Sequence, residues 1–172
     1  IRQTADTSMD GNVPVIDSNT KLILAKKIFL EKKEKTQFFD NKEYEIVREM
    51  KGFDLVGKTY KPLYAYLANA LPENQKPLLE NAFKVYEADF VTTEDGTGIV
   101  HTAVMYGQDD FVLGTKYNLP KFHIVDDSGH FTSDVTEFAG RFVKDEDVAV
   151  DIIKDLAHRG LLFKKEKYEH SY

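Results

Sequence analysis

Residues 92–111 read TTEDGTGIVHTAVMYGQDDF, and this stretch decides the predicted fold. Residues 94–98 predict a turn, because glycines reach positive φ values that other residues resist. Residues 99–103 have the apolar, β-branched character of a short buried strand. Gly107 ends that strand, and the acids that follow it suit the first turn of a helix running to Asn118. The stretch therefore predicts a turn–strand–turn–helix unit.

Such a unit brings two chemically active side chains, His101 and Asp110, to the same end of the predicted strand. A capped helix beside a structural histidine explains this local pattern as well as a functional site does, since short motifs are only hypotheses until their context is known. The neighbouring acid, Asp109, is interpreted as a helix cap rather than as a ligand.

The stretch resembles the editing-domain signature of isoleucyl-tRNA synthetases, which runs G-T-G-x-V-H-T-A-P-x-x-G-x-D-D. The match extends from Gly96 to Asp110, with Val104 in place of the usual proline. Valyl and leucyl relatives keep the G-T-G turn but lack the histidine with this D-D ending, so His101 points to the isoleucyl family. Two more segments fit the family: residues 52–64, which resemble a segment joining two strands of the editing barrel, and residues 126–132, which match D-x-x-G-x-F-T.

The resemblance implies an editing domain that hydrolyses mischarged valyl-tRNA(Ile), and possible hydrolysis of valyl-adenylate as well. Isoleucine and valine differ by one methylene group. A hydrophobic pocket can use that group to discriminate between the two amino acids by only about 1–3 kcal/mol, and isoleucyl-tRNA synthetase is itself the standard example of this limit. A second site that admits valyl esters and excludes isoleucyl esters by size overcomes the limit.

The resemblance also assigns roles to residues of the signature. Asp110 is expected to bind the α-ammonium group of the substrate, and His101 to hydrogen-bond near the ester or the terminal ribose. Water attacks the ester with help from the sugar hydroxyl, so no protein nucleophile is implied. The other expected substrate-binding residues lie beside these two: Gly98, Thr102, Ala103 and Tyr106.

Partners and cofactors follow from the same resemblance. The expected partners are the acceptor end of tRNA(Ile), the valyl ester or valyl-adenylate, and the catalytic domain of the parent synthetase. In the family, an H-S-Y motif, here residues 170–172, marks the return to that catalytic domain. No metal or cofactor is expected in the editing domain, because ATP and Mg²⁺ belong to the parent's catalytic domain.

The family places a threonine-rich segment, W-T-T-T-P-W-T, in its editing pocket. This chain has no tryptophan, and its one tandem threonine pair, Thr92–Thr93, belongs to the signature turn. The resemblance therefore predicts an incomplete pocket wall, with weak or no deacylase activity of this chain alone.

Composition limits the classes of protein. A chain of 172 residues with 42% hydrophobic and 30% charged residues predicts one globular domain, residues 1–172. Zero cysteines exclude disulfides and fit the reducing cytoplasm, and no run suits a membrane span or a signal peptide. A net charge of −6 argues against general nucleic-acid binding.

The rest of the chain predicts an α+β fold, a barrel-like and mostly antiparallel β domain with peripheral helices. Apolar side chains of residues 43–50 are expected to face inward, namely Tyr44, Ile46 or Val47, and Met50. The expected helices are 25–35, 108–118 and 146–159, with irregular structure at 65–80, and the expected strands are 13–16, 22–24, 43–50, 82–91 and 122–125.

Three functions compete at this point. The first is the editing hydrolase, and the second is a catalytically incomplete fragment that only binds the tRNA acceptor end or an aminoacyl-adenosine. The third is an unrelated metal hydrolase built on His101, Asp109 and Asp110, for which two ligand types at this spacing are weak support.

Overall fold

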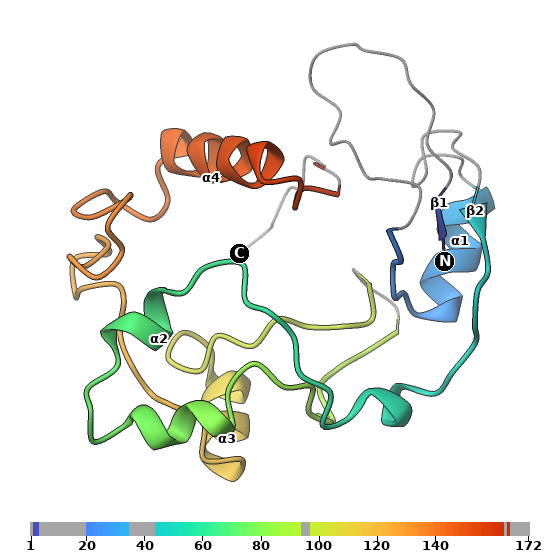
Figure 1. Ribbon diagram of the computed structural model, residues 1–172, viewed down its shortest axis with the longest axis horizontal. Coiled ribbons are helices and arrows are strands. Elements are labelled where there is room, and N and C mark those ends of the chain that lie inside the picture. The colour runs from blue at the N-terminus through green and yellow to red at the C-terminus, as the bar shows by residue number, and fades with distance from the viewer. Residues whose placement is uncertain (1, 4–19, 35–43, 94–96, 164, 166–172) are drawn as a thin grey trace.

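A computed structural model of the chain describes residues 2–3, 20–34, 44–93, 97–163 and 165. Within these ranges the chain forms four α-helices, two short 3-10 helices and one pair of antiparallel strands, with α1 and the strands at one end of the molecule and α2, α3 and α4 towards the other (Figure 1). The bounds are β1 (Arg2–Gln3), α1 (Lys26–Glu34), β2 (Tyr44–Glu45), η1 (Gly52–Leu55), α2 (Tyr66–Ala70), η2 (Lys76–Glu80), α3 (Gln108–Lys116) and α4 (Glu146–His158).

The predicted helices are confirmed, and their ends follow from local chemistry. Helix α4 begins after Asp145 and ends in a Schellman motif, in which Gly160 adopts φ +66° and the Leu161 amide donates to the Leu156 carbonyl over 2.8 Å. Helix α3 ends in the same way at Asn118, which adopts φ +51°. The short helices α2 and η2 confirm the irregular, partly helical structure expected over residues 65–80.

Most of the predicted strands are much shorter in the structure, or are replaced. Residues 22–24 form no strand, residues 43–50 are reduced to β2, and residues 82–91 contribute one bridge, between Thr59 and Lys84. Residues 52–64, which were expected to join two strands, begin with η1. A strand is held by its neighbours, so an apolar run without a paired neighbour does not stay in a ladder. The strand expected at 13–16 lies outside the described residues, and the barrel remains a prediction.

The side chains expected to face inward along residues 43–50 behave differently from one another. Tyr44 is half-buried and packs edge-on against Phe29, with ring centroids 5.4 Å apart. The prediction is wrong for Ile46, Val47 and Met50, which are 50%, 46% and 39% exposed. Tyr44 lies within β2 beside the Phe29 ring, whereas Ile46, Val47 and Met50 follow the end of the strand.

The strand predicted over residues 122–125 is reduced to one bridge, and a tight turn follows it. Val125 pairs with Phe131, and Gly129 adopts φ +82° in the turn between them. The Asp126 carboxylate accepts hydrogen bonds from the His130 amide and from the amide and hydroxyl of Ser128, at 2.8–2.9 Å. These bonds, that from His130 first, hold the pKa of Asp126 below its usual range. Hydrogen bonds between residues of the turn therefore hold its conformation.

A polar junction attaches α4 to the chain before α2. The Tyr64 hydroxyl donates to Asp155 over 2.7 Å, and the Tyr66 hydroxyl donates to Glu137. The two tyrosine rings stack with centroids 5.3 Å apart. Arg159 lies over the Tyr64 ring and donates to the Leu63 carbonyl over 2.6 Å. Burial, with the hydrogen bond to Asp155, raises the pKa of Tyr64 to about 12.

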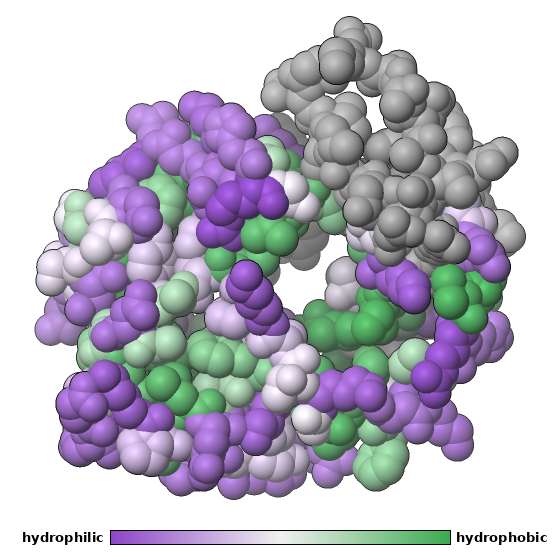
Figure 2. All heavy atoms as spheres, viewed as in Figure 1, coloured by the Kyte–Doolittle hydropathy of each residue, from purple (hydrophilic) through white to green (hydrophobic). Residues whose placement is uncertain are grey.

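Buried apolar side chains lie in several elements rather than in one layer. Phe29 of α1 packs with partly buried neighbours that include Leu22 and Phe163. Apolar residues also remain on the surface, and Figure 2 shows them gathered beside the hollow near the middle of the face viewed there. No helix of the described residues is long and apolar enough to cross a membrane. The other buried apolar residues are Ile28, Leu71, Leu113, Val135, Phe138 and Val148.

Candidate functional site

The glycine turn of the signature packs against the start of α1. Gly98 adopts φ +76°, and a Cβ at this position would overlap the Ala25 methyl group. The Ala25 amide donates to the Thr97 carbonyl over 2.8 Å, which fixes the contact. A side chain at residue 98 would therefore be excluded by both backbone conformation and space. The first residues of the predicted turn, 94–96, lie outside the described residues.

The buried strand predicted over residues 99–103 is not formed. Ile99 and Val100 are 47% and 51% exposed, and His101 is exposed as well. The chain bends directly afterwards, because the Tyr106 amide donates to the Ala103 carbonyl over 2.8 Å. Among the described residues no strand pairs with residues 99–103, and β-branched residues favour a strand only where a neighbouring strand packs beside them.

Asp110 lies in the first turn of α3, against the residue that caps the helix. The N-cap is Gly107, in an extended conformation, and not Asp109 as the sequence predicted. A Cβ on Gly107 would overlap the Asp110 carboxylate, so the carboxylate bends back over the helix N-terminus. The helix dipole favours a negative charge there. Glycine at residue 107 thus makes room for the Asp110 side chain.

His101 and Asp110 flank the bend between the glycine turn and α3. Neither side chain takes part in a hydrogen bond or an ion pair among the described residues. Both are therefore available to a ligand, which is what a substrate-binding role requires. Between them, Thr102 and Ala103 are half-buried.

Tyr106 has a structural role that sequence reasoning missed. Its hydroxyl oxygen accepts hydrogen bonds from the amides of Ile124 and Val125, at 2.9 and 3.1 Å. Its ring meets the His123 ring edge-on, with centroids 5.8 Å apart, and half of the residue stays exposed. Tyr106 therefore attaches the hairpin to the signature while leaving part of its surface for a substrate. Two amides that share one acceptor far along the chain leave no signal in the sequence.

The departure from the family pattern at Val104 has a packing partner. A Cβ added to Gly114 would overlap the methyl groups of Val104. Gly114 is buried in α3, so the absence of a side chain lets the helix approach the bend closely. The Val104–Gly114 contact therefore positions α3, and with it Asp110, relative to the signature turn.

The metal-site hypothesis gains no support from the geometry. Among the residues that the structure describes, no group of three histidine or acidic side chains could hold a metal ion. His101, Asp109 and Asp110 are all described and form no such group.

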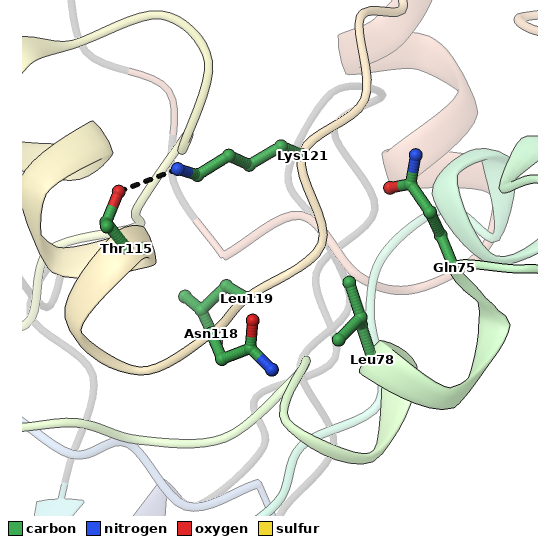
Figure 3. Close-up of a pocket in the computed structure, with 7 residues that line it drawn as sticks. Gln75, Leu78, Thr115, Asn118, Leu119 and Lys121 are labelled. Carbon is green, nitrogen blue, oxygen red and sulfur yellow. Dashed lines mark hydrogen bonds between the residues drawn. The ribbon is translucent and has the colours of Figure 1, made fainter.

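A cavity of about 230 Å³ lies at the C-terminal end of α3 (Figure 3), and its lining includes neither His101 nor Asp110. Lys121 reaches across from the chain after the helix, and its ammonium group donates to the Thr115 hydroxyl over 2.7 Å. No feature of the sequence predicted this cavity, because its walls come from distant segments. The lining residues are Gln75, Leu78, Gly114, Thr115, Asn118, Leu119 and Lys121.

No family model matches the chain. Comparison with curated proteins finds isoleucine–tRNA ligases. The ligase of Bdellovibrio bacteriovorus is 42% identical over 132 residues, which are 77% of this chain and 12% of the relative. That of Clostridium novyi is 44% identical over 130 residues, 76% of this chain and 12% of the relative. That of Bacillus thuringiensis strain Al Hakam is 37% identical over 175 residues, covering 98% of this chain and 16% of the relative. The chain thus spans 12–16% of the length of these three relatives.

Proposed function

The chain belongs to the isoleucine–tRNA ligase family and is homologous to one segment of these enzymes. We propose that this segment is their editing region. Its activity is the hydrolysis of valyl-tRNA(Ile), with valyl-adenylate as a second substrate. The region works in the cytoplasm, as part of a ligase whose catalytic domain uses ATP and Mg²⁺.

The observation that carries the proposal is the pair His101 and Asp110. Both side chains are without hydrogen-bond or ion-pair partners among the described residues, and they flank the bend that matches the editing signature. A carboxylate at a helix N-terminus is stabilised as an anion. Asp110 can therefore receive the α-ammonium group of a valyl ester as its counter-charge.

The reaction needs the protein to position the substrate rather than to attack it. Asp110 holds the ammonium group, and His101 hydrogen-bonds at the ester or the terminal ribose. The oxygen of a water molecule adds to the ester carbonyl carbon, and the carbon–oxygen bond to the ribose breaks. The ribose oxygen leaves and takes up a proton that the attacking water molecule loses, and free valine is released. Exclusion of the larger isoleucyl ester supplies the selectivity.

Hydrolysis of valyl-tRNA(Ile) tests the proposal directly. The chain is placed in the Bacillus thuringiensis ligase instead of its matching segment, because that match covers 98% of the chain. Asp110→Ala is expected to lower the hydrolysis rate by about ten- to a hundredfold, the worth of one hydrogen bond to a charged group. Asp109→Ala is the matched control, since Asp109 is exposed in the same helical turn. Equal rates for the unsubstituted and Asp110→Ala ligases would contradict the proposal.

A second function, binding without hydrolysis, is favoured by one observation. His101 is exposed, and the cavity of Figure 3 does not include it, so the described residues alone do not surround an ester. The chain by itself would then bind a non-hydrolysable valyl-adenosine analogue and leave valyl-tRNA(Ile) intact. Hydrolysis by the isolated chain would exclude this second function.

A further inference from the structure

Helix α3 turns one face towards the rest of the molecule, and Asp110 and Gly114 both lie on it. They are four residues apart, so they lie one above the other on the helix surface. Along this face, Leu113 and Gly114 are buried and Asp110 is half-buried. Phe111 and Val112, on the opposite face, are 44% and 62% exposed. The carboxylate that we assign to the substrate therefore shares a face with the glycine that lets α3 approach the bend.

Val104 occupies the other side of this approach. It follows the signature residues 101–103 directly, and the hydrogen bond from the Tyr106 amide to the Ala103 carbonyl closes the bend around it. A Cβ on Gly114 would overlap one Val104 methyl group, lie 3.0 Å from the other and lie 3.3 Å from the Val104 Cβ. All three separations are shorter than ordinary van der Waals contact between carbon atoms. Helix α3 is therefore already as close to the bend as Val104 allows.

The two parts of the candidate site meet through this contact. Residues 101–103 belong to the bend, whereas Asp110 belongs to α3. We propose that Val104 and Gly114 are positioning residues for ester hydrolysis, because their combined volume places the Asp110 carboxylate at the distance from the bend that the substrate requires. This inference rests on the proposed function, since it takes Asp110 as the group that binds the ammonium group of the valyl ester.

A methyl group added at residue 114 would separate the two parts. To regain ordinary contact distances, α3 must withdraw from Val104 by about 1 Å. The helix begins at Gln108, shortly after Val104, so it withdraws by tilting or sliding as a unit. Either movement displaces Asp110 by roughly 0.5–1 Å, given the rise of an α-helix per residue. Such a displacement reaches or exceeds the tolerance of about 0.5 Å within which a productive site must be held.

Hydrolysis of valyl-tRNA(Ile) by the Bacillus thuringiensis ligase that carries this chain tests the inference through a volume swap. Gly114→Ala is expected to lower kcat/KM by about tenfold, because the carboxylate is displaced. Val104→Ala removes both methyl groups that the new side chain would meet, so the double variant Val104→Ala/Gly114→Ala is expected to recover most of the loss. Val104→Ile enlarges the contact from the side of the bend and is expected to lower kcat/KM too, which keeps the test decisive if Gly114→Ala does not fold.

The dependence of hydrolysis on Asp110 separates positioning from an effect on stability. In the unsubstituted ligase, Asp110→Ala is expected to lower the rate by about ten- to a hundredfold. In the Gly114→Ala ligase the same substitution is expected to cost clearly less, because a displaced carboxylate has already lost part of its contact with the ammonium group. In the double variant its full cost is expected to return. An equal cost of Asp110→Ala in all three ligases is what a loss of stability alone would give, and it would overturn the inference.

Two variants are matched controls. Gly52→Ala adds the same methyl group where no atom lies within 4 Å, and Val112→Ala removes the same two methyl groups from the exposed face of α3. Both are expected to leave hydrolysis unchanged. Unchanged hydrolysis in Gly114→Ala and Val104→Ile, or no recovery in the double variant, would overturn the inference and leave the editing role of Asp110 intact. No effect of Asp110→Ala in the unsubstituted ligase would contradict the proposed function, and this inference with it.

Discussion

Two segments of similar apolar character, residues 44–63 and residues 122–160, bury their side chains very differently. In the 44–63 segment, Phe53 is 75% exposed and Leu63 is 52% exposed. In the 122–160 segment, Val135 and Val148 are only 2% and 1% exposed. The two segments therefore differ in what their apolar residues pack against rather than in how many they have.

The difference lies in where each segment finds its hydrogen-bond partners. The 122–160 segment closes a hairpin through Asp126 and ends α4 with a Schellman motif, all within a few residues along the chain. The 44–63 segment needs remote partners, and it finds them at β1 and at the bridge between Thr59 and Lys84. Local closure costs little chain entropy, whereas remote pairing needs the partner strand to be held in place.

The largest effect is expected from shortening a valine in each segment. Val148→Ala should lower the free energy of unfolding by about 2 kcal/mol, because it removes two buried carbons and leaves a cavity. Val47→Ala removes the same atoms from a side chain that is 46% exposed. It should therefore change the free energy of unfolding by less than about 0.5 kcal/mol. Urea unfolding of both variants measures the contrast. Equal losses would show that the 44–63 segment is packed after all.

A smaller contrast is expected from adding a methyl group to a glycine in each segment. Gly129 adopts φ +82°, and its Cβ would lie 2.7 Å from the Phe142 ring, so Gly129→Ala should cost about 1–2 kcal/mol. Gly52 has no atom within 4 Å of such a Cβ, so Gly52→Ala should leave the free energy of unfolding unchanged or raise it slightly. Thermal unfolding distinguishes the two, and a destabilised Gly52→Ala variant would contradict the open environment of η1.

The smallest effect concerns the hydrogen bond that joins Tyr64, directly after the 44–63 segment, to Asp155 of α4, and it appears only at high pH. The pKa of Tyr64 is raised from 10.0 to about 12 in the folded chain, so its contribution to stability is present below pH 10. That contribution is lost as the pH rises through about 12, since the unfolded chain then releases the proton more readily. Tyr64→Phe should flatten this part of the curve of Tm against pH. An unchanged alkaline slope would show that the hydrogen bond to Asp155 adds nothing.

The sequence predicted those parts of the fold whose hydrogen bonds and caps come from residues a few positions apart along the chain. Helices α3 and α4 and the hairpin turn at Gly129 follow from acids, glycines and apolar spacing within a few positions. The prediction of strands over residues 22–24 and 99–103 was wrong, because a β-branched run forms a strand only when another strand lies beside it.

The candidate site was predictable only in its residue types. His101 and Asp110 were identified through the family signature, and the sequence gives no measure of their exposure. The hydrogen bonds to Tyr106 and the contact of Val104 with Gly114 join positions ten or more residues apart. Neither contact leaves a pattern in a single sequence, since neither has a fixed spacing.

NMR titration of the chain with a non-hydrolysable valyl-adenosine analogue tests the editing proposal most directly. We expect amide shifts that cluster between Gly98 and Asp110 and that disappear in the Asp110→Ala variant. A folded chain whose spectrum does not change, or whose shifts lie away from this stretch, would contradict the proposal that these residues bind the aminoacyl end of tRNA.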